Sequence, residues 1–139
     1  DGVGADIYRI PATGGSAELL AGLPSIQEMF PVFMDNGHLA YTRWTSPLQH
    51  DDEIYFLDLA NGTHRGAAFN STNGADDSDP FAINNWVGFS SSRTENGKGG
   101  WDLYLGDPNS ATPVHLRQLS TSRHDLGGTY TPSVVGRTK

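Results

Sequence analysis

The sequence predicts an all-β fold, because the chain is rich in turn-forming residues, has no helical period and repeats three short strand motifs in a fixed order. Of its 139 residues, 17 are glycine and 8 are proline, and 18% are charged. An average globular protein has about 25% charged residues. The segment nearest to a helical pattern, residues 17–23, contains Gly22 and is followed by Pro24, which end a helix early. We therefore expect many short strands joined by tight turns.

A motif of an acidic residue, an aliphatic residue and tyrosine occurs three times. The copies begin 47 and then 49 positions apart, and they read Asp6-Ile7-Tyr8, Glu53-Ile54-Tyr55 and Asp102-Leu103-Tyr104. A regular period of this length is the signature of a repeat architecture. The tyrosine motif therefore sets the length of the repeating unit.

Two further motifs keep the same register. A proline motif recurs with its prolines 49 and 52 positions apart, at residues 30–33, 79–82 and 131–134. Between the proline motif and the tyrosine motif lies an alternating segment that ends in arginine, at residues 39–43 and 87–93. Each repeat therefore contains several strands.

Each repeat is predicted to hold four strands: the proline segment, the arginine-ended segment, the tyrosine segment and a tail such as residues 114–119. The turns between them are rich in residues that accept a positive φ, as tight hairpins require. These turns are Asp35-Asn36-Gly37, Asn61-Gly62, Gly14-Gly15 and Asn96-Gly97. Four antiparallel strands that repeat every 40 to 50 residues or so are typical of a β-propeller blade.

The order of these motifs resembles the TolB-type β-propeller repeat. Units of that family run from Asp-Pro through a strand, a turn and a strand ending in Ser-x-Arg, then to Asp-Ile-Tyr and an apolar strand. The resemblance covers residues 6–136, with departures in the turns Asn84-Asn85 and Val135-Gly136 and in the insert at residues 44–52. It implies a propeller of six or seven blades.

The register of the motifs predicts a partial propeller with two complete blades. The expected units are a partial blade at residues 6–28, blades at 29–78 and 79–128, and the start of a further blade at 129–139. Propellers close with about four to eight blades. We therefore expect the remaining blades to come from the same parent chain or from other copies of this one.

Charge and composition exclude several partners. The net charge of −7 argues against nucleic acid, which binds clustered Lys and Arg. No apolar run approaches the ~20 residues that span a bilayer. The chain has no cysteine, so disulfides and thiolate metal sites are excluded. The family resemblance implies a periplasmic or extracellular location. The sequons at Asn61 and Asn70 are open to glycosylation or are simply turn sequences.

The candidate ligand-binding residues lie in loops that would form one rim of the propeller. Loops on a rigid scaffold are where binding residues concentrate, and tryptophan suits stacking on a sugar ring or docking of a peptide. The candidates are Trp44, Gln49, His50, Asp51, Trp101 and His124. The alternative interpretation is that each tryptophan packs between neighbouring blades and that the histidines have structural roles.

One acidic cluster has part of the spacing of a calcium loop. Asp76, Asp77 and Asp79 offer hard oxygen ligands, but Pro80 follows where a calcium loop would continue. The alternative is that these carboxylates tie down a turn through hydrogen bonds to the backbone. We expect no other cofactor, because the sequence contains no zinc motif, nucleophile elbow, phosphate loop or dinucleotide fingerprint.

The expected function is a non-catalytic binding or scaffold propeller that engages a protein or a glycan through its rim loops. This expectation follows from the family resemblance, since TolB-like propellers serve as protein-interaction platforms. The alternative is an enzyme: a carbohydrate-active propeller of the polysaccharide lyase type, or the propeller domain of a prolyl-oligopeptidase-like peptidase. An array of blades that only self-assembles is the third possibility.

Overall fold

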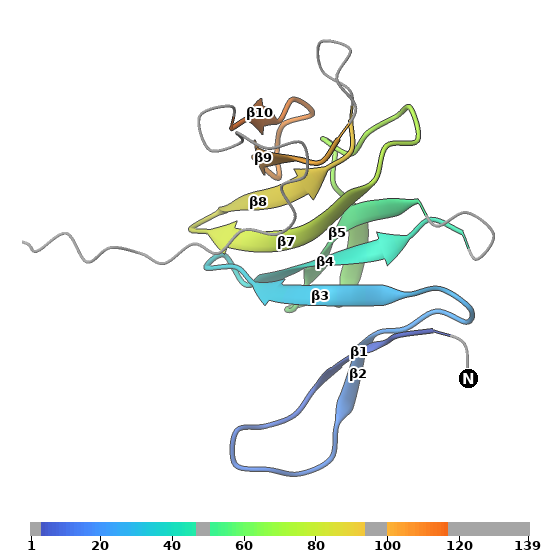
Figure 1. The fold of residues 1–139 in the computed structure, drawn as a ribbon. Helices are drawn as coiled ribbons and strands as arrows, with labels where there is room; N and C mark the ends of the chain where they lie inside the picture. The colour runs from blue at the N-terminus through green and yellow to red at the C-terminus, as the bar shows by residue number, and fades with distance from the viewer. Residues whose placement is uncertain (1–3, 47–50, 94–99, 117–139) are drawn as a thin grey trace, which may run out of the picture.

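The computed structural model describes residues 4–46, 51–93 and 100–116, and this part of the chain is all-β (Figure 1). Its strands form three antiparallel sheets of two, four and four strands. The two-stranded sheet contains β1 (Ile7–Arg9) and β2 (Glu18–Ala21). The second sheet contains β3 (Glu28–Phe33), β4 (His38–Trp44), β5 (Asp52–Asp58) and β6 (Thr63–Gly66). The third sheet contains β7 (Asp77–Ile83), β8 (Trp86–Ser91), β9 (Asp102–Gly106) and β10 (Val114–His115).

The predicted fold class is confirmed as all-β, and the repeated motifs form equivalent strands. The proline motif lies in β3 and β7, the arginine-ended segment in β4 and β8, and the tyrosine motif in β5 and β9. In both four-stranded sheets each strand pairs with the next one along the chain. That these sheets are propeller blades stays a prediction. Among the described residues there is no helix, and so none long and apolar enough to cross a membrane.

The segment nearest to a helical pattern is a strand. Residues 18–21 form β2, which pairs with β1. Here tertiary pairing overrides local propensity, because β2 places Ala21 in a core that the second sheet completes. The strand expected at residues 114–119 begins at Val114 as β10. Three of the four predicted turns are confirmed, since Gly14, Gly37 and Gly62 all have positive φ. The fourth, Asn96-Gly97, lies outside the described residues.

A β-bulge interrupts the first strand of each four-stranded sheet at the residue before proline. Phe30 and Asp79 both have a φ of 53°, and the pairing register shifts there in each sheet. A residue before proline is kept out of the right-handed helical region, and a bulge bends its strand. The repeat in the sequence is therefore also a repeat in backbone conformation.

The main core lies between the two four-stranded sheets. Phe69, on the connection from β6 to β7, stacks on Phe89 with ring centroids 4.9 Å apart and meets Phe56 edge to face at 6.2 Å. Phe89 in turn stacks on Tyr104 at 5.7 Å. All four rings are buried. This aromatic row joins one sheet to the other, and Figure 1 shows β7 lying beside β4 and β5.

A second core lies between the two-stranded sheet and the second sheet. Its buried members are Ile7, Ala21, Leu39, Tyr41 and Leu57. Since side chains alternate along a strand, β4 sends Leu39 and Tyr41 to this core and Ala40 to the main core. Strand β4 is therefore buried on both faces.

The main core leaves no space at Gly106. A Cβ atom there would lie 2.4 Å from the ring of Phe69, which is 1% exposed. Gly106→Ala is therefore expected to lower the free energy of unfolding by about 1–3 kcal/mol, the usual cost of overpacking a core. Urea unfolding measures this. Gly66→Ala is the matched control: it places Cβ no closer than 3.7 Å to a neighbour, so a comparable loss in that variant would contradict the packing described here.

Candidate functional site

Six carboxylates gather at the edge of the sheets where β4 and β8 end and β5 and β7 begin. Figure 1 shows β4 and β8 running in one direction and β7 in the other. The backbone N–H of Asp52 donates to Asp76 Oδ1 at 3.2 Å, which ties the start of β5 to the start of β7. We name the group the acidic edge; it consists of Asp51, Asp52, Glu53, Asp76, Asp77 and Asp79.

One guanidinium bonds to the acidic edge. Arg93, just beyond β8, places Nη2 2.6 Å from Asp77 Oδ2. The same nitrogen donates to the carbonyl oxygen of Phe69 at 3.1 Å, and Nε donates to Ser91 Oγ at 2.8 Å. The guanidinium also lies 4.9 Å from the centre of the Tyr104 ring. These contacts fix Arg93 in one orientation, directed at a single carboxylate.

Asp77 is a buried acid, and only one of its two carboxylate oxygens has hydrogen-bond partners. It is 0% exposed, and its Oδ2 accepts from the N–H of Ser71 at 2.8 Å as well as from Arg93. Its Oδ1 is buried and has no hydrogen-bond partner. A buried carboxylate normally fills its hydrogen-bonding capacity, so this oxygen is a departure from ordinary core chemistry.

Glu53 is the first residue of the second tyrosine motif, and no cation of residues 4–46, 51–93 and 100–116 pairs with it. It is 7% exposed, and its Oε2 is buried without a hydrogen-bond partner. Burial and, to a smaller extent, the nearby charges of Asp77 and Asp51 raise the pKa of Glu53 to about 8, although the charge of Arg93 lowers it. At neutral pH this carboxyl group therefore retains a proton to a large extent.

The outer carboxylates of the edge are affected in the same direction. Burial raises the pKa of Asp51, with Asp76 and Asp77 adding to the effect. Burial also raises the pKa of Asp52 and of Asp79. Four of the six acids, Asp51, Asp52, Asp76 and Asp79, are partly exposed. The edge thus has partly exposed carboxylates beside two buried ones, and it favours the uptake of protons or of a cationic group.

The structure places some of the predicted site residues at this edge. Trp44 is the last residue of β4 and pairs with Asp52 across the sheet. Asp51 belongs to the acidic edge, and Trp101 directly precedes β9. Both tryptophans are partly buried. Gln49, His50 and His124 lie outside the described residues.

The three candidate metal ligands all belong to the acidic edge, but they bond to the protein itself. Asp76 and Asp77 accept the backbone hydrogen bonds described above, and the N–H of Asp79 donates to Thr42 Oγ1 at 3.2 Å. Within residues 4–46, 51–93 and 100–116, no group of three or more His, Cys, Asp and Glu side chains is arranged to hold a metal ion. The calcium site stays a prediction.

Sequence reasoning missed Glu53 and Arg93 as site residues. In the sequence, both residues are recognisable only as members of repeated motifs. The residue of the next copy that matches Glu53 is Asp102, which is partly exposed. The available signal was the run Asp51-Asp52-Glu53, which leads into the apolar residues of β5. Glu53 directly precedes Ile54 in this strand, and both residues are buried.

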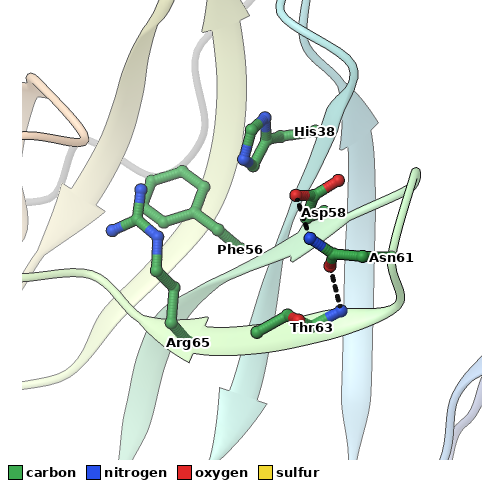
Figure 2. Close-up of a pocket in the computed structure, with 6 residues that line it drawn as sticks. All are labelled: His38, Phe56, Asp58, Asn61, Thr63 and Arg65. Carbon is green, nitrogen blue, oxygen red and sulfur yellow. Dashed lines mark hydrogen bonds between the residues drawn. The ribbon is translucent and has the colours of Figure 1, made fainter.

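A small cavity of about 150 Å³ lies at the opposite edge, beneath the turn between β5 and β6 (Figure 2). Its polar side chains bond to one another: Asn61 Nδ2 donates to Asp58 Oδ2, and Asn61 Oδ1 accepts from the N–H of Thr63, both at 2.8 Å. The Arg65 guanidinium covers the Phe56 ring at 4.9 Å. Ligand pockets span about 300–1,000 Å³, so this cavity is smaller than a ligand pocket. Its side chains support the turn between β5 and β6.

Both sequon asparagines use their amide nitrogen inside the fold. Asn61 Nδ2 donates to Asp58, as above. Asn70 Nδ2 donates to the carbonyl oxygen of Ile54 at 2.9 Å, and its Oδ1 accepts from the N–H of Ile54 at 3.1 Å. These two hydrogen bonds of Asn70 join the start of β5 to the connection between the two four-stranded sheets. Glycosylation at either residue would replace one of the two hydrogen atoms on that nitrogen and leave the other to donate.

No protein-family model and no curated protein matches this chain. The resemblance to TolB-type repeats therefore stays an expectation, and function has to be argued from the acidic edge itself.

Glu53→Gln is expected to stabilise the protein at high pH. The raised pKa means that the folded state holds the Glu53 proton up to about pH 8, whereas the unfolded chain releases it near 4.5. Wild-type stability is therefore lost as the pH rises from about 4.5 to 8. A neutral glutamine avoids this loss, with a gain on the order of a few kcal/mol at pH 8.5 that disappears at pH 4.

Urea unfolding at both pH values measures the effect. The control is Glu18→Gln, the same chemical change at a carboxylate that is 60% exposed. A constant difference between wild type and Glu53→Gln across this pH range would show that Glu53 ionises normally.

Proposed function

We propose that the chain is a segment of a β-propeller that catalyses no reaction and binds a protein partner through the acidic edge. Two sheets of four strands, each with its strands in chain order, support the propeller interpretation. The three motifs that recur in register along the chain support it independently. The partner class follows from the charges at the edge.

The observation that carries the proposal is the shortage of cations. Within the described part of the chain, Arg93 is the one Lys or Arg side chain that pairs with any of the six carboxylates, and it is committed to Asp77. Glu53 Oε2 and Asp77 Oδ1 are buried without a hydrogen-bond partner, which costs stability. Unsatisfied buried polar groups of this kind are expected near functional sites. Basic side chains of a partner would pair with the partly exposed carboxylates of the same edge.

The exposure of the edge fits a protein partner with lysine or arginine side chains. The partly exposed Asp51, Asp52 and Asp76 are the acids available for direct contact. Trp44 and Trp101 lie at the same edge. Protein interfaces are enriched in aromatic residues, and opposite charges steer association. A partner segment with basic side chains and an apolar side chain would therefore contact both the carboxylates and the tryptophans.

The test is binding of a fluorescent arginine- and serine-containing peptide, measured by anisotropy at low and at physiological salt. We expect saturable binding that weakens with salt, because the contacts are electrostatic and partly exposed. Asp51→Asn combined with Asp76→Asn should weaken binding several-fold. The asparagine at position 76 retains the oxygen that accepts from Asp52, so the edge keeps its shape.

Asp35→Asn is the matched control, because Asp35 is an exposed carboxylate in the turn between β3 and β4, at the opposite edge. Equal loss of affinity in this control would mean that peptide binding depends only on the net charge of the protein, and the proposal would be wrong. Failure of the peptide to bind, together with quenching of tryptophan fluorescence by oligosaccharides, would instead support the glycan alternative.

A further inference from the structure

Three asparagine-glycine pairs lie within the described residues, and all three are exposed. They are Asn36-Gly37 between β3 and β4, Asn61-Gly62 between β5 and β6, and Asn73-Gly74 on the connection from β6 to β7. Their glycines have almost the same φ: 78°, 72° and 76°. The three pairs therefore share sequence, exposure and glycine φ, and their hydrogen bonds distinguish them.

An asparagine that precedes glycine can lose its side-chain nitrogen. The backbone nitrogen of the glycine attacks the asparagine Cγ, and glycine has no Cβ to obstruct this approach. The attacking N–H must first give up its proton, so a hydrogen bond from that N–H to a carbonyl oxygen protects the pair. The hydrogen bonds of the glycine N–H groups therefore rank the three pairs.

Asn61-Gly62 is protected by its turn. The Gly62 N–H donates to the carbonyl oxygen of Asp58 at 2.8 Å. The Asn61 amide is also held on both sides, by Asp58 Oδ2 and by the N–H of Thr63, as Figure 2 shows. Both reacting groups of this pair are therefore engaged in hydrogen bonds.

Asn36-Gly37 has the same kind of protection with longer hydrogen bonds. The Gly37 N–H donates to the carbonyl oxygen of Met34 at 3.3 Å. Asn36 Oδ1 accepts from the N–H of His38 at 3.2 Å. We therefore expect this pair to be less well protected than Asn61-Gly62.

Asn73-Gly74 lacks this protection. In the described ranges of the chain, no acceptor bonds to the Gly74 N–H or to Asn73 Nδ2. Asn73 Oδ1 accepts a hydrogen bond from the hydroxyl of Ser71, which draws electron density away from Asn73 Cγ. The attacking nitrogen is therefore available, and the carbon that it attacks is activated.

Asn73 also lies where water can complete the reaction. It lines a cavity of about 380 Å³ together with Ser71, Thr72 and Arg93. Thr72, Asn73 and Gly74 are all exposed. Water therefore has access to the asparagine and to the glycine that follows it.

We propose that Asn73 is a site of spontaneous deamidation, and that the fold directs this reaction to Asn73 in preference to Asn36 and Asn61. The Gly74 nitrogen forms a bond to Asn73 Cγ and loses its proton, and Nδ2 leaves with that proton as ammonia. The product is a succinimide ring. Water then opens the ring at one of its two carbonyl carbons, which yields aspartate or isoaspartate at position 73. Water is the only co-reactant, and the proposal does not depend on the function proposed for the acidic edge.

The two products change the connection from β6 to β7 in different ways. Both add a carboxylate to the cavity wall that Arg93 shares. Isoaspartate also adds a methylene group to the backbone between Ser71 and Asp77. The Ser71 N–H donates to Asp77 Oδ2 at 2.8 Å, and this bond closes the segment 71–77. The isoaspartate form should therefore unfold at a lower urea concentration than Asn73→Asp, which adds the charge alone, and equal urea midpoints would contradict this effect.

Incubation of the folded chain at pH 8.5, followed by trypsin digestion and mass spectrometry, tests the proposal. Cleavage after arginine places the three pairs on separate peptides, residues 10–43, 44–65 and 66–93. We expect Asn73 to deamidate about fivefold faster than Asn61 or more, because the Gly62 N–H has to break a hydrogen bond first. A sample digested without incubation gives the background. Equal rates at the two asparagines, or a faster rate at Asn61, would overturn the proposal.

The unfolded chain is the matched control. In concentrated urea all three glycine N–H groups face solvent, so the three rates should become similar. If Asn73 remained the fastest by the same ratio in urea, the local sequence and not the fold would set the rate, and the proposal would be wrong.

Two variants locate the reaction. Asn73→Gln should stop the change in peptide 66–93, because the longer glutamine side chain forms a larger ring more slowly; persistence of the change would overturn the assignment to Asn73. Ser71→Ala removes the hydroxyl that bonds to Asn73 and keeps the N–H that bonds to Asp77. Deamidation should therefore slow several-fold in a protein that still folds, and an unchanged rate would overturn the activation by Ser71.

Discussion

The ion pair between Arg93 and Asp77 is the interaction on which the acidic edge depends. Asp77 begins β7, Arg93 follows β8, and the same guanidinium holds the carbonyl of Phe69. Phe69 stacks in the aromatic row that joins the two four-stranded sheets. One cation therefore fixes two strands and the connection between the sheets. Breaking a buried pair leaves an uncompensated charge, so Arg93 stays with Asp77, and no other cation in the described part of the chain pairs with Glu53.

Both four-stranded sheets pair an acid with an arginine, but the two pairs differ in geometry. An acid begins the first strand of each four-stranded sheet, and an arginine follows at the end of the second strand. In the third sheet the pair is closed and Asp77 is completely buried. In the second sheet Glu28 and Arg43 are separated, and a cavity lies beside them. The two copies of the motif therefore differ in how closely the acid and the arginine approach each other.

The strand order could be predicted from the sequence because the motifs carry their own backbone requirements. The motifs around Pro31 and Pro80 predicted the first strands, and Asn61-Gly62 predicted a hairpin, whereas the bulges in the first strands were not predicted. The segment that became β2 has no strand alternation of its own, and it is a strand because it pairs with β1. The acids at residues 76–79 were visible in the sequence, whereas the isolation of Glu53 was not. Burial and the direction of Arg93 depend on how two sheets pack, and a motif within one sheet carries no information about that packing.

The acidic edge holds more carboxylates than Arg93, its one cation among the described residues, can stabilise, and the ionisation of Glu53 reports on this most directly. Titration of the side-chain carboxyl carbon of Glu53 by NMR, assigned by comparison with Glu53→Gln, measures its pKa in the folded protein. We expect a midpoint of about 8. A midpoint near the ordinary value of 4.5 would mean that Glu53 is hydrated or paired, and the shortage of cations at this edge would not exist.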